Sequence, residues 1–598
     1  MIDLLLMQAT LDAVKELYGQ EVEEKVIQIS KTRKDLEGDF TLVVFPLARV
    51  SRKSPMDTAE ELGKYITEKL QPVSDYRVIK GFLNFIIDDS YFLDFYKNNV
   101  KDSDFGILTC EDQRPVVIEY SAPNTNKPLH LGHIRNNLLG YSMGELLKAN
   151  GKNVKKVNLI NDRGIHICKS MLAWAKWGEG ATPESRSMKG DKLVGDFYVL
   201  FDQKYKEEIK QIMEQGKEEE EAKKSAPLIL EAQEMLRKWE ANDADVRALW
   251  TKMNQWVYDG FDVTYGRMGV DFDKVYHESE TYLLGKEIVL EGLEKGILFK
   301  KEDGSVWADL TDEGLDQKLL LRGDGTSVYM TQDIGTAQLR FNDYAPNEML
   351  YVVGNEQNYH FDVLKRVLIK LGKDWAEAIR HISYGMVELP EGKMKSREGT
   401  VVDADDLMDE MCATAKATTI ELGKIEGFSE QEAEELFETI GQGALKYFIL
   451  KVDPKKKMMF NPKESIDFNG NTGPFIQYTH ARIQSIIRKA NEIEGFDLED
   501  ALTAVPKDEL LDKEKQLLKK ISHYPDAVKQ AGDAYSPALI ANYVYDLVKE
   551  YNQFYHEITI LKEEDEQKRN FRIGMSYFVA SILKKGMAIL GVKVPERM

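Results

Sequence analysis

The segment 115–160 constrains the fold more than any other part of the chain. A short apolar run, Val116–Ile118, is followed by a loop rich in proline and asparagine, a long periodic stretch, Leu129–Ala149, and a second apolar run, Val154–Ile160. This order is typical of a strand, a loop, a helix and a strand. A β-α-β unit implies a parallel sheet, and the ligand sites of such sheets lie at the carboxyl ends of their strands. The pattern predicts an α/β fold with a binding site just after Ile118.

Strand and helix patterns alternate again later in the chain, which favours a doubly wound parallel sheet. The expected elements are strands around Val275 and at Met349–Val353 and Ile382–Val387, and helices at Leu283–Lys295 and His360–Leu371. We therefore predict a Rossmann-type domain over residues 113–402. A charged helical insertion at about 174–246 interrupts it, and its run of Glu and Lys is typical of a solvated helix face.

The two ends of the chain differ from this central domain. The first hundred residues combine an amphipathic helix with strand-like runs at Phe40–Phe45 and Phe82–Ile87, whereas the pattern after Val402 is almost wholly helical. We predict a small N-terminal α+β domain and a C-terminal all-α helical bundle entered at the Gly/Asn-rich stretch Asn469–Gly473. The predicted boundaries are 1–112, 113–402, a helical connecting region at 403–469, and 470–598.

The charge of the chain is acidic overall but uneven. Its 598 residues include 80 basic and 101 acidic ones, a net charge of −21, which argues against a polyanionic partner unless local fields differ from the average. Asp403–Glu438 holds twelve acids against two lysines, whereas Lys446–Lys463 holds six lysines against one acid, with Tyr447 and Phe460 interleaved. The second segment is therefore a candidate nucleic-acid surface. A solvated lysine-rich turn explains it equally well.

Cysteine use and hydropathy indicate the compartment. Cys110, Cys168 and Cys412 show neither zinc-site spacing nor the even count of a disulfide framework, so we expect a reducing compartment and no structural metal. The N-terminus lacks the pattern of a signal peptide, and Lys584 and Lys585 interrupt the most apolar late stretch. The sequence thus predicts a cytoplasmic protein that does not use a membrane.

The strongest chemical motif lies where the first strand gives way to its helix: Glu119-Tyr-Ser-Ala-Pro-Asn-Thr-Asn-Lys-Pro-Leu-His-Leu-Gly-His133. His130 and His133 are three residues apart, so they share one face of the first helical turn. A helix N-terminus attracts phosphate, and Gly132 lets a nucleotide approach the backbone. Two imidazoles there can donate hydrogen bonds to phosphoryl oxygens during displacement. The motif predicts a nucleotide site.

A second motif, together with the first, resembles the signatures of a known enzyme family. His-Leu-Gly-His resembles the His-Ile-Gly-His signature of class I aminoacyl-tRNA synthetases, and Gly392-Lys-Met-Lys-Ser-Arg-Glu-Gly399 resembles their Lys-Met-Ser-Lys-Ser signature. Lys393 and Met394 match its first two positions, but Ser396 stands where the second lysine is expected. Many arginyl-tRNA synthetases lack that lysine and have one before the first histidine instead, as Lys127 is here. Either loop can deliver a cation to departing pyrophosphate.

The resemblance to arginyl-tRNA synthetases implies roles for individual residues. ATP would be bound by Lys127, His130, Gly132, His133, Lys393, Met394 and Ser396, of which Lys127, His130, His133 and Lys393 would be catalytic. A guanidinium substrate requires carboxylate partners. The family resemblance of Tyr329-Met-Thr-Gln-Asp-Ile-Gly335 implies that Glu119 and Asp333 bind the guanidinium beside Tyr329. Ser121, Asn124 and Gln357 would complete the arginine site.

The same resemblance implies the reaction and its partners. ATP with Mg²⁺ would activate L-arginine to arginyl-adenylate, which is then transferred to the 3′-terminal adenosine of tRNA(Arg). The N-terminal domain would touch the corner of the tRNA, residues 470–598 would bind its anticodon, and activation would commonly need bound tRNA. The chain is expected to act as a monomer.

Rival functions can be ranked from the same residues. A small adenylating ligase would not need a C-terminal helical domain, and a cysteinyl-tRNA synthetase would be expected to show zinc-spaced cysteines. A non-catalytic tRNA-binding paralogue would not need to retain both histidines, Lys127 and Lys393. A dinucleotide-dependent dehydrogenase does not fit, because the first strand–helix turn lacks a Gly-x-Gly-x-x-Gly run.

Overall fold

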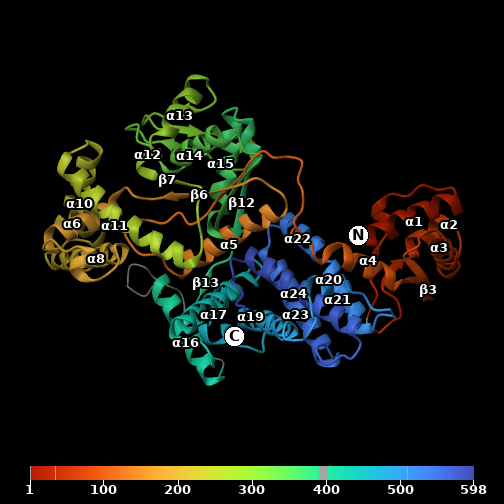
Figure 1. Cartoon of the computed structure of the whole chain (residues 1–598). Coiled ribbons are helices and arrows are strands. Elements are labelled where there is room, and N and C mark those ends of the chain that lie inside the picture. Colours follow the sequence, from red (N-terminus) through yellow and green to blue (C-terminus); the bar gives the residue numbers. More distant parts are fainter. Residues whose placement is uncertain (1, 34, 389–401, 424, 508) are drawn as a thin grey trace. The chain divides into compact units, whose positions relative to one another are not determined.

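The computed structural model describes residues 2–33, 35–388, 402–423, 425–507 and 509–598 (Figure 1). The chain forms two compact units, each made of separate segments. Unit 1 is Met1–Phe105, Ile486–Ser522 and Glu550–Val579, and unit 2 is Gly106–Ser485, His523–Lys549 and Ala580–Met598. This division follows spatial contacts, so the predicted domain boundaries along the chain remain predictions.

The N-terminal part of unit 1 is the predicted α+β fold. Helix α1 (Ile2–Tyr18) precedes an antiparallel sheet of order β1-β2-β4-β3, and the predicted runs form two of its strands, β2 (Phe40–Val43) and β4 (Phe82–Ile87). The other strands and helices are β1 (Ile29–Lys31), β3 (Val73–Ile79), α2 (Phe45–Ser51), α3 (Pro55–Lys69) and α4 (Asp89–Asn99). Ser54 caps α3 by accepting from Asp57 N–H, and Pro55 occupies the first helical position, where no N–H is needed.

A parallel sheet of order β12-β11-β5-β6-β7 forms the centre of unit 2, as the β-α-β pattern predicts. Its strands are β5 (Val116–Glu119), β6 (Val154–Ile160), β7 (Lys274–His277), β11 (Glu348–Gly354) and β12 (Ile379–Tyr384), and every adjacent pair is parallel. All four residues of β5 are buried, which explains its continuous apolar run up to Glu119. The strand order reverses between β5 and β11, the position where doubly wound sheets bind their ligands.

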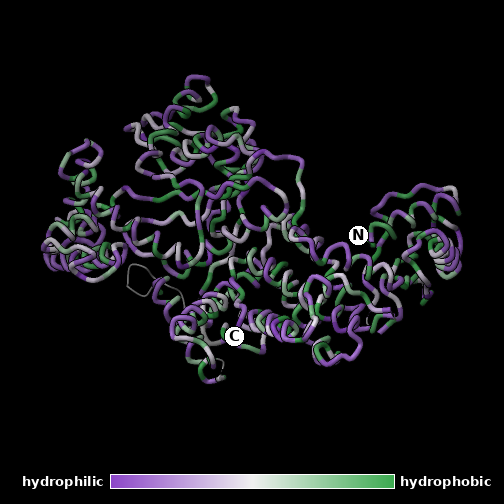
Figure 2. The backbone as a smooth tube through the Cα atoms, in the orientation of Figure 1, coloured by the Kyte–Doolittle hydropathy of each residue, from purple (hydrophilic) through white to green (hydrophobic). Residues whose placement is uncertain are grey.

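Helices cover both faces of this sheet. One core includes Val117 and Val157 together with residues of α13 (Leu284–Glu294), α14 (Tyr329–Tyr344) and α15 (Asn358–Lys370). Helix α5 (Leu131–Ala149) packs on the other side of β5, where Gly144 faces Ile118 and Lys156. In Figure 2 hydrophobic and hydrophilic segments alternate along the helices, as expected for helices with one buried face.

The charged insertion is helical, but it also has a core. Leu172, Leu193, Phe201 and Leu228 belong to one buried cluster, so the solvated-face interpretation holds for part of its surface only. Its helices are α6 (Ile165–Trp177), α7 (Pro183–Arg186), α8 (Gly190–Glu214), α9 (Glu219–Ser225), α10 (Pro227–Glu240) and α11 (Ala244–Met268). A small antiparallel sheet that the sequence patterns did not predict follows α13: β8 (Phe299–Lys300), β9 (Val306–Ala308) and β10 (Lys318–Leu321).

The region after Val402 is helical as predicted, apart from β14 (Met458–Met459), which pairs in parallel with β13 (Val387–Glu388). Its helices are α16 (Ala404–Glu421), α17 (Glu430–Leu450), α18 (Pro462–Ser465), α19 (Gly473–Ala490), α20 (Leu498–Thr503), α21 (Asp512–Ser522), α22 (Tyr524–Asp533), α23 (Pro537–Glu557) and α24 (Glu566–Ile589). Within the described ranges, no helix is long and apolar enough to cross a membrane.

The proposed lysine and aromatic surface at 446–463 is wrong in part. Tyr447 and Phe460 are core residues with no exposed surface, and Lys446 is buried with its ammonium donating to the carbonyl of Gly591. Burial lowers the pKa of Lys446 to about 8. The one-dimensional pattern could not separate these side chains from the exposed ones, because α17 carries Lys446 and Tyr447 into the core and Phe460 is buried after β14. Only the turn at Lys455–Lys457 is a fully exposed basic patch within the described part of this segment.

Candidate active site

The predicted site residues gather at the carboxyl edge of the parallel sheet. Glu119 ends β5, and β5 lies between β11 and β6. The loop after β5 crosses to β6, where Thr125 N–H donates to Asn161 O (3.0 Å) and Asn161 N–H donates to Pro123 O (2.8 Å). The loop therefore spans the strand ends at the switch point, which is where the sequence placed the binding site.

The backbone directly after β5 is strained. Ser121 and Ala122 both have positive φ values, 81° and 46°, which non-glycine residues seldom adopt. Asn136 of α5 accepts from Ser121 N–H, and Asn158 of β6 accepts from Ala122 N–H (3.0 Å). Two buried amides thus hold this turn in place, as is common where a fold positions functional groups.

His130 and His133 begin α5 and hydrogen-bond to its first turn. His130 is the N-cap, and its Nδ1 accepts from Gly132 N–H (3.1 Å), while His133 Nδ1 accepts from His130 N–H (3.2 Å). The ring centroids are 3.9 Å apart. Because both Nδ1 atoms accept, the ring proton of each neutral histidine is on Nε2. The fold therefore presents two Nε2–H donors from one helical turn.

Both histidines are held in the neutral form. Burial, with a smaller contribution from the Lys127 ammonium, lowers the pKa of His130 to about 4. Burial and the nearby His130 and Lys127 lower the pKa of His133 well below its ordinary value. A neutral imidazole can donate to a phosphoryl oxygen without taking part in proton transfer. This pair is thus suited to stabilising charge on phosphate.

Lys127 lies beside these histidines and next to the insertion. It lines a cavity of about 230 Å³ together with His130, Lys192 of α8 and Asp403. The backbone of α8 comes close at this point, because a Cβ added to Gly195 would be 2.7 Å from Pro128 Cδ. The insertion therefore helps to shape the loop that carries the predicted catalytic lysine, and Lys192 is a second cation there that the sequence patterns did not single out.

The predicted residues Lys393, Met394 and Ser396 lie outside the described residues. The described chain on the far side of that gap is nevertheless fixed beside the histidine motif. Leu131 N–H donates to Val402 O (3.2 Å) and Ala404 N–H donates to Leu129 O (3.0 Å). The described residues Val402–Ala404 thus lie beside Leu129–Leu131, which are more than 250 residues earlier in the sequence.

Glu119 is buried and already has a cationic partner. Its Oε2 accepts from Nη2 of Arg340, which lies on α14, and the two side chains are 9% and 1% exposed. Burial raises the pKa of Glu119, Arg340 opposes that shift, and the charge of Asp333 adds to it. The Asp333 carboxylate is therefore near enough to Glu119 for its charge to raise the pKa of Glu119.

Asp333 lies on the first turns of α14 and pairs with His360 of α15. His360 Nε2 and Asp333 Oδ2 are 2.6 Å apart, and Asp333 is about one-third exposed. The sequence analysis placed His360 at the start of an expected helix without giving it a role, and it did not single out Arg340. Arg340 follows Asp333 by seven residues, or two helical turns, so the two residues lie on the same face of α14. This spacing was a sequence signal that could have identified Arg340.

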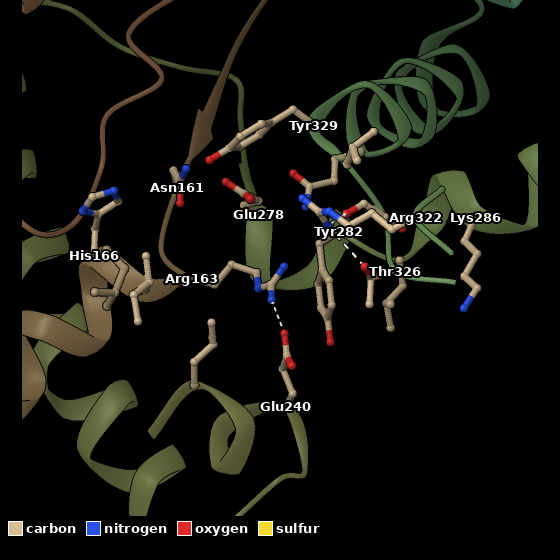
Figure 3. Close-up of a pocket in the computed structure, with 18 of the residues that line it drawn as sticks. Asn161, Arg163, His166, Glu240, Glu278, Tyr282, Lys286, Arg322, Thr326 and Tyr329 are labelled. Atoms are coloured by element: carbon tan, nitrogen blue, oxygen red, sulfur yellow. Dashed lines mark hydrogen bonds and ion pairs between the residues drawn. The ribbon is translucent and has the colours of Figure 1, made fainter. Parts of the chain in front are cut away.

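Tyr329 and Asn124 line a second, larger cavity of about 620 Å³ (Figure 3). Tyr329 is 73% exposed, so it is not a core residue. Burial raises the pKa of Glu278, the first residue of helix α12 (Glu278–Thr281) directly after β7, to about 7. Arg163 pairs with Glu240 of the insertion (2.8 Å) and lies 3.9 Å from the ring centroid of Tyr282. Basic, acidic and aromatic groups thus share this cavity.

The remaining predicted arginine ligands are Ser121 and Gln357. Ser121 is buried and its hydroxyl lies 2.7 Å from that of Tyr265 on α11, so it is already engaged elsewhere. Gln357 ends a short 3₁₀ turn, Asn355–Gln357, directly after β11 and is exposed. The structure places both at the carboxyl edge of the sheet, and their binding roles remain predictions.

Comparisons with known families cover most of the chain. Residues 99–461 match a model described as tRNA synthetases class I (R), catalytic domain, residues 5–87 match the arginyl tRNA synthetase N terminal domain, and residues 476–598 match the DALR anticodon binding domain. The first of these matches spans more than half of the chain.

Individual proteins agree with these matches. The chain is 60% identical over 594 residues to an arginine–tRNA ligase of Bacteroides thetaiotaomicron, with 99% of each chain covered. It is 60% identical over 588 residues to that of Porphyromonas gingivalis, with 98% of each covered. The arginyl-tRNA synthetase structure of Thermus thermophilus shares the fold, with a TM-score of 0.78 at 24% identity over the full length of both chains. On its site geometry and these matches, the chain belongs to the arginyl-tRNA synthetase family of class I aminoacyl-tRNA synthetases.

Proposed function

We propose that this chain catalyses the ATP-dependent ligation of L-arginine to tRNA(Arg) with the residues at the carboxyl edge of its parallel sheet. In the first step, the arginine carboxylate attacks the α-phosphorus of ATP, a carboxyl–phosphate bond forms, and the bond to pyrophosphate breaks. In the second step, a ribose hydroxyl of the terminal tRNA adenosine attacks the carbonyl carbon and AMP leaves. One observation carries the proposal: two neutral histidines at the start of α5 and the buried acid Glu119 at the end of β5 share the switch point between β5 and β11.

The phosphate end of the site is assigned to His130, His133 and Lys127. Charge moves onto phosphoryl oxygens as pyrophosphate departs, and donors already in place stabilise it without reorganisation. The two Nε2–H groups are oriented by their Nδ1 hydrogen bonds to the α5 backbone. Lys127 supplies the cation, and Lys393, Met394 and Ser396 are proposed to complete the site from the second signature.

The amino-acid end is assigned to Glu119 and Asp333. A guanidinium has five N–H donors in a plane and no acceptor, so carboxylate oxygens from two elements suit it. Tyr329, Asn124, Ser121 and Gln357 are proposed to position the rest of arginine at the same edge. A lysine ammonium is a compact point charge and would satisfy the two acids less well.

The larger cavity is proposed to receive the tRNA terminus. It adjoins the site through Asn124 and Tyr329, and Arg163 and Arg322 also line it. Exposed aromatic rings and cations are the groups that hold single-stranded nucleotides. We expect the tRNA(Arg) acceptor end to reach the adenylate from this side, whereas 5–87 and 476–598 contact other parts of the tRNA.

Magnesium is proposed to enter as part of the ATP substrate. Among the described residues, no group of three or more His, Cys, Asp or Glu side chains is placed to hold a metal ion. Mg²⁺ is commonly bound largely through substrate phosphates, where it neutralises their charge. The steps above are therefore assigned to protein groups alone. We also propose that the chain acts as a monomer, which sedimentation can test. We propose that it acts in the cytoplasm, where charged tRNA is supplied to translation.

The deciding experiment is ATP–pyrophosphate exchange with each of the standard amino acids, with and without tRNA(Arg). We expect exchange with arginine only, and we expect it to depend on tRNA as the family resemblance implies. Charging of tRNA(Arg) with labelled arginine checks the second step. Exchange driven by another amino acid, or no exchange with arginine plus tRNA, would contradict the proposed function.

A further inference from the structure

The first turn of helix α8 contributes a lysine to the cavity beside the histidine motif. Lys127, His130 and Lys192 line the same cavity of about 230 Å³. Gly195 and Val199, one and two turns further along α8, line it as well, so one face of the helix forms a wall of the cavity. Lys192 therefore lies on the face of α8 that borders the proposed phosphate site.

The start of α8 is held in place by a largely buried ionic cluster. The ammonium of Lys189, which precedes the helix, donates to Thr264 Oγ1 of α11 (2.6 Å) and to Asp405 Oδ2 of α16. It also pairs with Asp191 (3.3 Å), whose side chain is almost fully buried. Three helices thus meet one turn before Lys192, and they fix the backbone that carries it.

The start of α16 also lies against the histidine motif. Asp403, the N-cap of α16, forms a backbone bridge with His130 and lines the cavity. Burial raises the pKa of the Asp403 carboxyl, and the positive charge of Lys192 opposes that shift. The Lys192 ammonium is thus within electrostatic range of the segment that pairs with His130.

The ion pair that Lys192 makes on its own helix is weak. Its Nζ is 3.7 Å from Asp196 Oδ1, and the two side chains are 48% and 53% exposed. A solvent-exposed pair of this kind adds little to stability, so an anion of higher charge can take the place of Asp196 as the partner of Lys192.

The charges of the cavity give Lys192 a role towards polyphosphate. The carboxylates of Asp196, Asp403 and Asp406 line the cavity with the two ammonium groups, and His130 is neutral. Three carboxylates and two ammonium groups leave one net negative charge, which the Mg²⁺ proposed to accompany ATP would offset. Without Lys192 the excess of negative charge doubles, and a polyphosphate that enters the cavity meets stronger repulsion.

We propose that Lys192 is a further catalytic residue for arginine activation: its ammonium binds the departing pyrophosphate together with that of Lys127. The arginine carboxylate forms its bond to the α-phosphorus, the bond from that phosphorus to the bridging oxygen breaks, and the electron pair stays on pyrophosphate. The charge of pyrophosphate therefore grows next to two ammonium groups that are already in place. The inference rests on the proposed function and gives the helical insertion a direct part in the chemistry.

The test is ATP–pyrophosphate exchange and single-turnover adenylate formation with Lys192→Met and Lys192→Arg, in the presence of tRNA(Arg). Lys192→Met removes the charge and keeps an apolar side chain. We expect it to raise KM for pyrophosphate about tenfold and to lower the rate of adenylate formation about 30-fold, with KM for arginine within about twofold of wild type. Lys192→Arg keeps the charge, so KM for pyrophosphate and the rate should stay within about threefold of wild type.

Controls separate a catalytic role from a structural one. Lys204→Met changes a lysine of the same helix that pairs with Glu207 (3.0 Å), and it should alter neither KM nor the rate. Thermal unfolding checks that each variant folds, and Lys192→Gln, with the same expected losses, replaces Lys192→Met if the latter does not fold. A loss of fold would lower the unfolding temperature and would not spare KM for arginine.

The outcomes also separate this inference from the proposed function. If wild type shows no exchange with arginine and tRNA(Arg), the proposed function is wrong, and so is the role of Lys192. If wild type exchanges while Lys192→Met leaves KM for pyrophosphate and the rate of adenylate formation unchanged, only the role of Lys192 is overturned. Equal increases in KM for arginine and for pyrophosphate, or a Lys192→Arg variant as impaired as Lys192→Met, likewise overturn it.

Discussion

The proposed phosphate end and the proposed guanidinium end of the site differ in how burial affects their titratable groups. At the phosphate end, burial lowers the pKa of His130 and His133, and the nearby Lys127 ammonium lowers it further. At the guanidinium end, burial raises the pKa of Glu119, but Arg340 opposes it. Both sets of groups lie along one edge of the same sheet.

The difference follows from what each end must bind. Phosphate oxygens need donors, and a neutral imidazole with its proton on Nε2 is one; a guanidinium needs acceptors, and an ionised carboxylate is the strongest. Glu119 pairs with an oppositely charged side chain, Arg340, and this counter-ion helps the buried carboxylate to keep its charge. The predictions below test that contrast.

The largest effect is expected for Lys127→Ala. Lys127 is a cation proposed to act on the departing pyrophosphate, so its removal should lower the rate of arginine activation about 10³-fold, with little change in thermal stability. Pre-steady-state adenylate formation measures it. Lys148→Ala, a surface lysine of α5 paired with Glu145, is the matched control. A near-normal rate would show that Lys127 does not replace the missing signature lysine.

At the other end, Asp333→Asn should act on arginine alone. The loss of one charged acceptor for the guanidinium should raise KM for arginine about 10²-fold and leave KM for ATP within about twofold. Steady-state charging with each substrate varied in turn measures both. Asp362→Asn, an exposed acid of α15, is the control. Equal changes in both KM values would mean that the two ends are not separate.

Acid should destabilise the phosphate end through its histidines. The pKa of His130 is about 4 in the folded protein against an ordinary value of 6.5, so the unfolded chain binds more protons between these values. The contribution of neutral His130 to the free energy of unfolding is complete above pH 6.5 and is lost as pH falls towards 4. Between pH 7 and 5, wild type should lose about 2 kcal/mol more unfolding free energy than His130→Gln. Urea unfolding at both pH values measures this, and equal losses would contradict the neutral assignment.

The smallest effect is expected where the insertion contacts the catalytic loop. Gly195→Ala places a Cβ 2.7 Å from Pro128 Cδ and should displace Lys127, which lowers activation about tenfold. Gly266→Ala on α11 is matched, because its Cβ meets nothing within 4 Å. That control should keep full activity. Equal behaviour of the two variants would mean that the insertion does not position Lys127.

Local patterns predicted the elements that build the site. Apolar runs and periodicity located β5, α5, β6, β11 and α15 to within a few residues, because a parallel sheet buries its strands on both faces and its helices on one. The motif between β5 and α5 predicted both histidines on the first helical turn. These features depend on residues that are close together in the sequence, so they can be recognised from the sequence alone.

Partners distant in sequence were not predictable in this way. Arg340 and Glu119 are 221 residues apart, and no local pattern shows that they meet. Lys446 and Tyr447 look like parts of a basic surface, but they lie in the core. The sequence by itself determined the fold class and located the signature residues, whose chemical roles remain predictions. Only the tertiary structure decided which groups are buried and which counter-ion each one meets, and burial with its partners is what determines whether a titratable group keeps its charge.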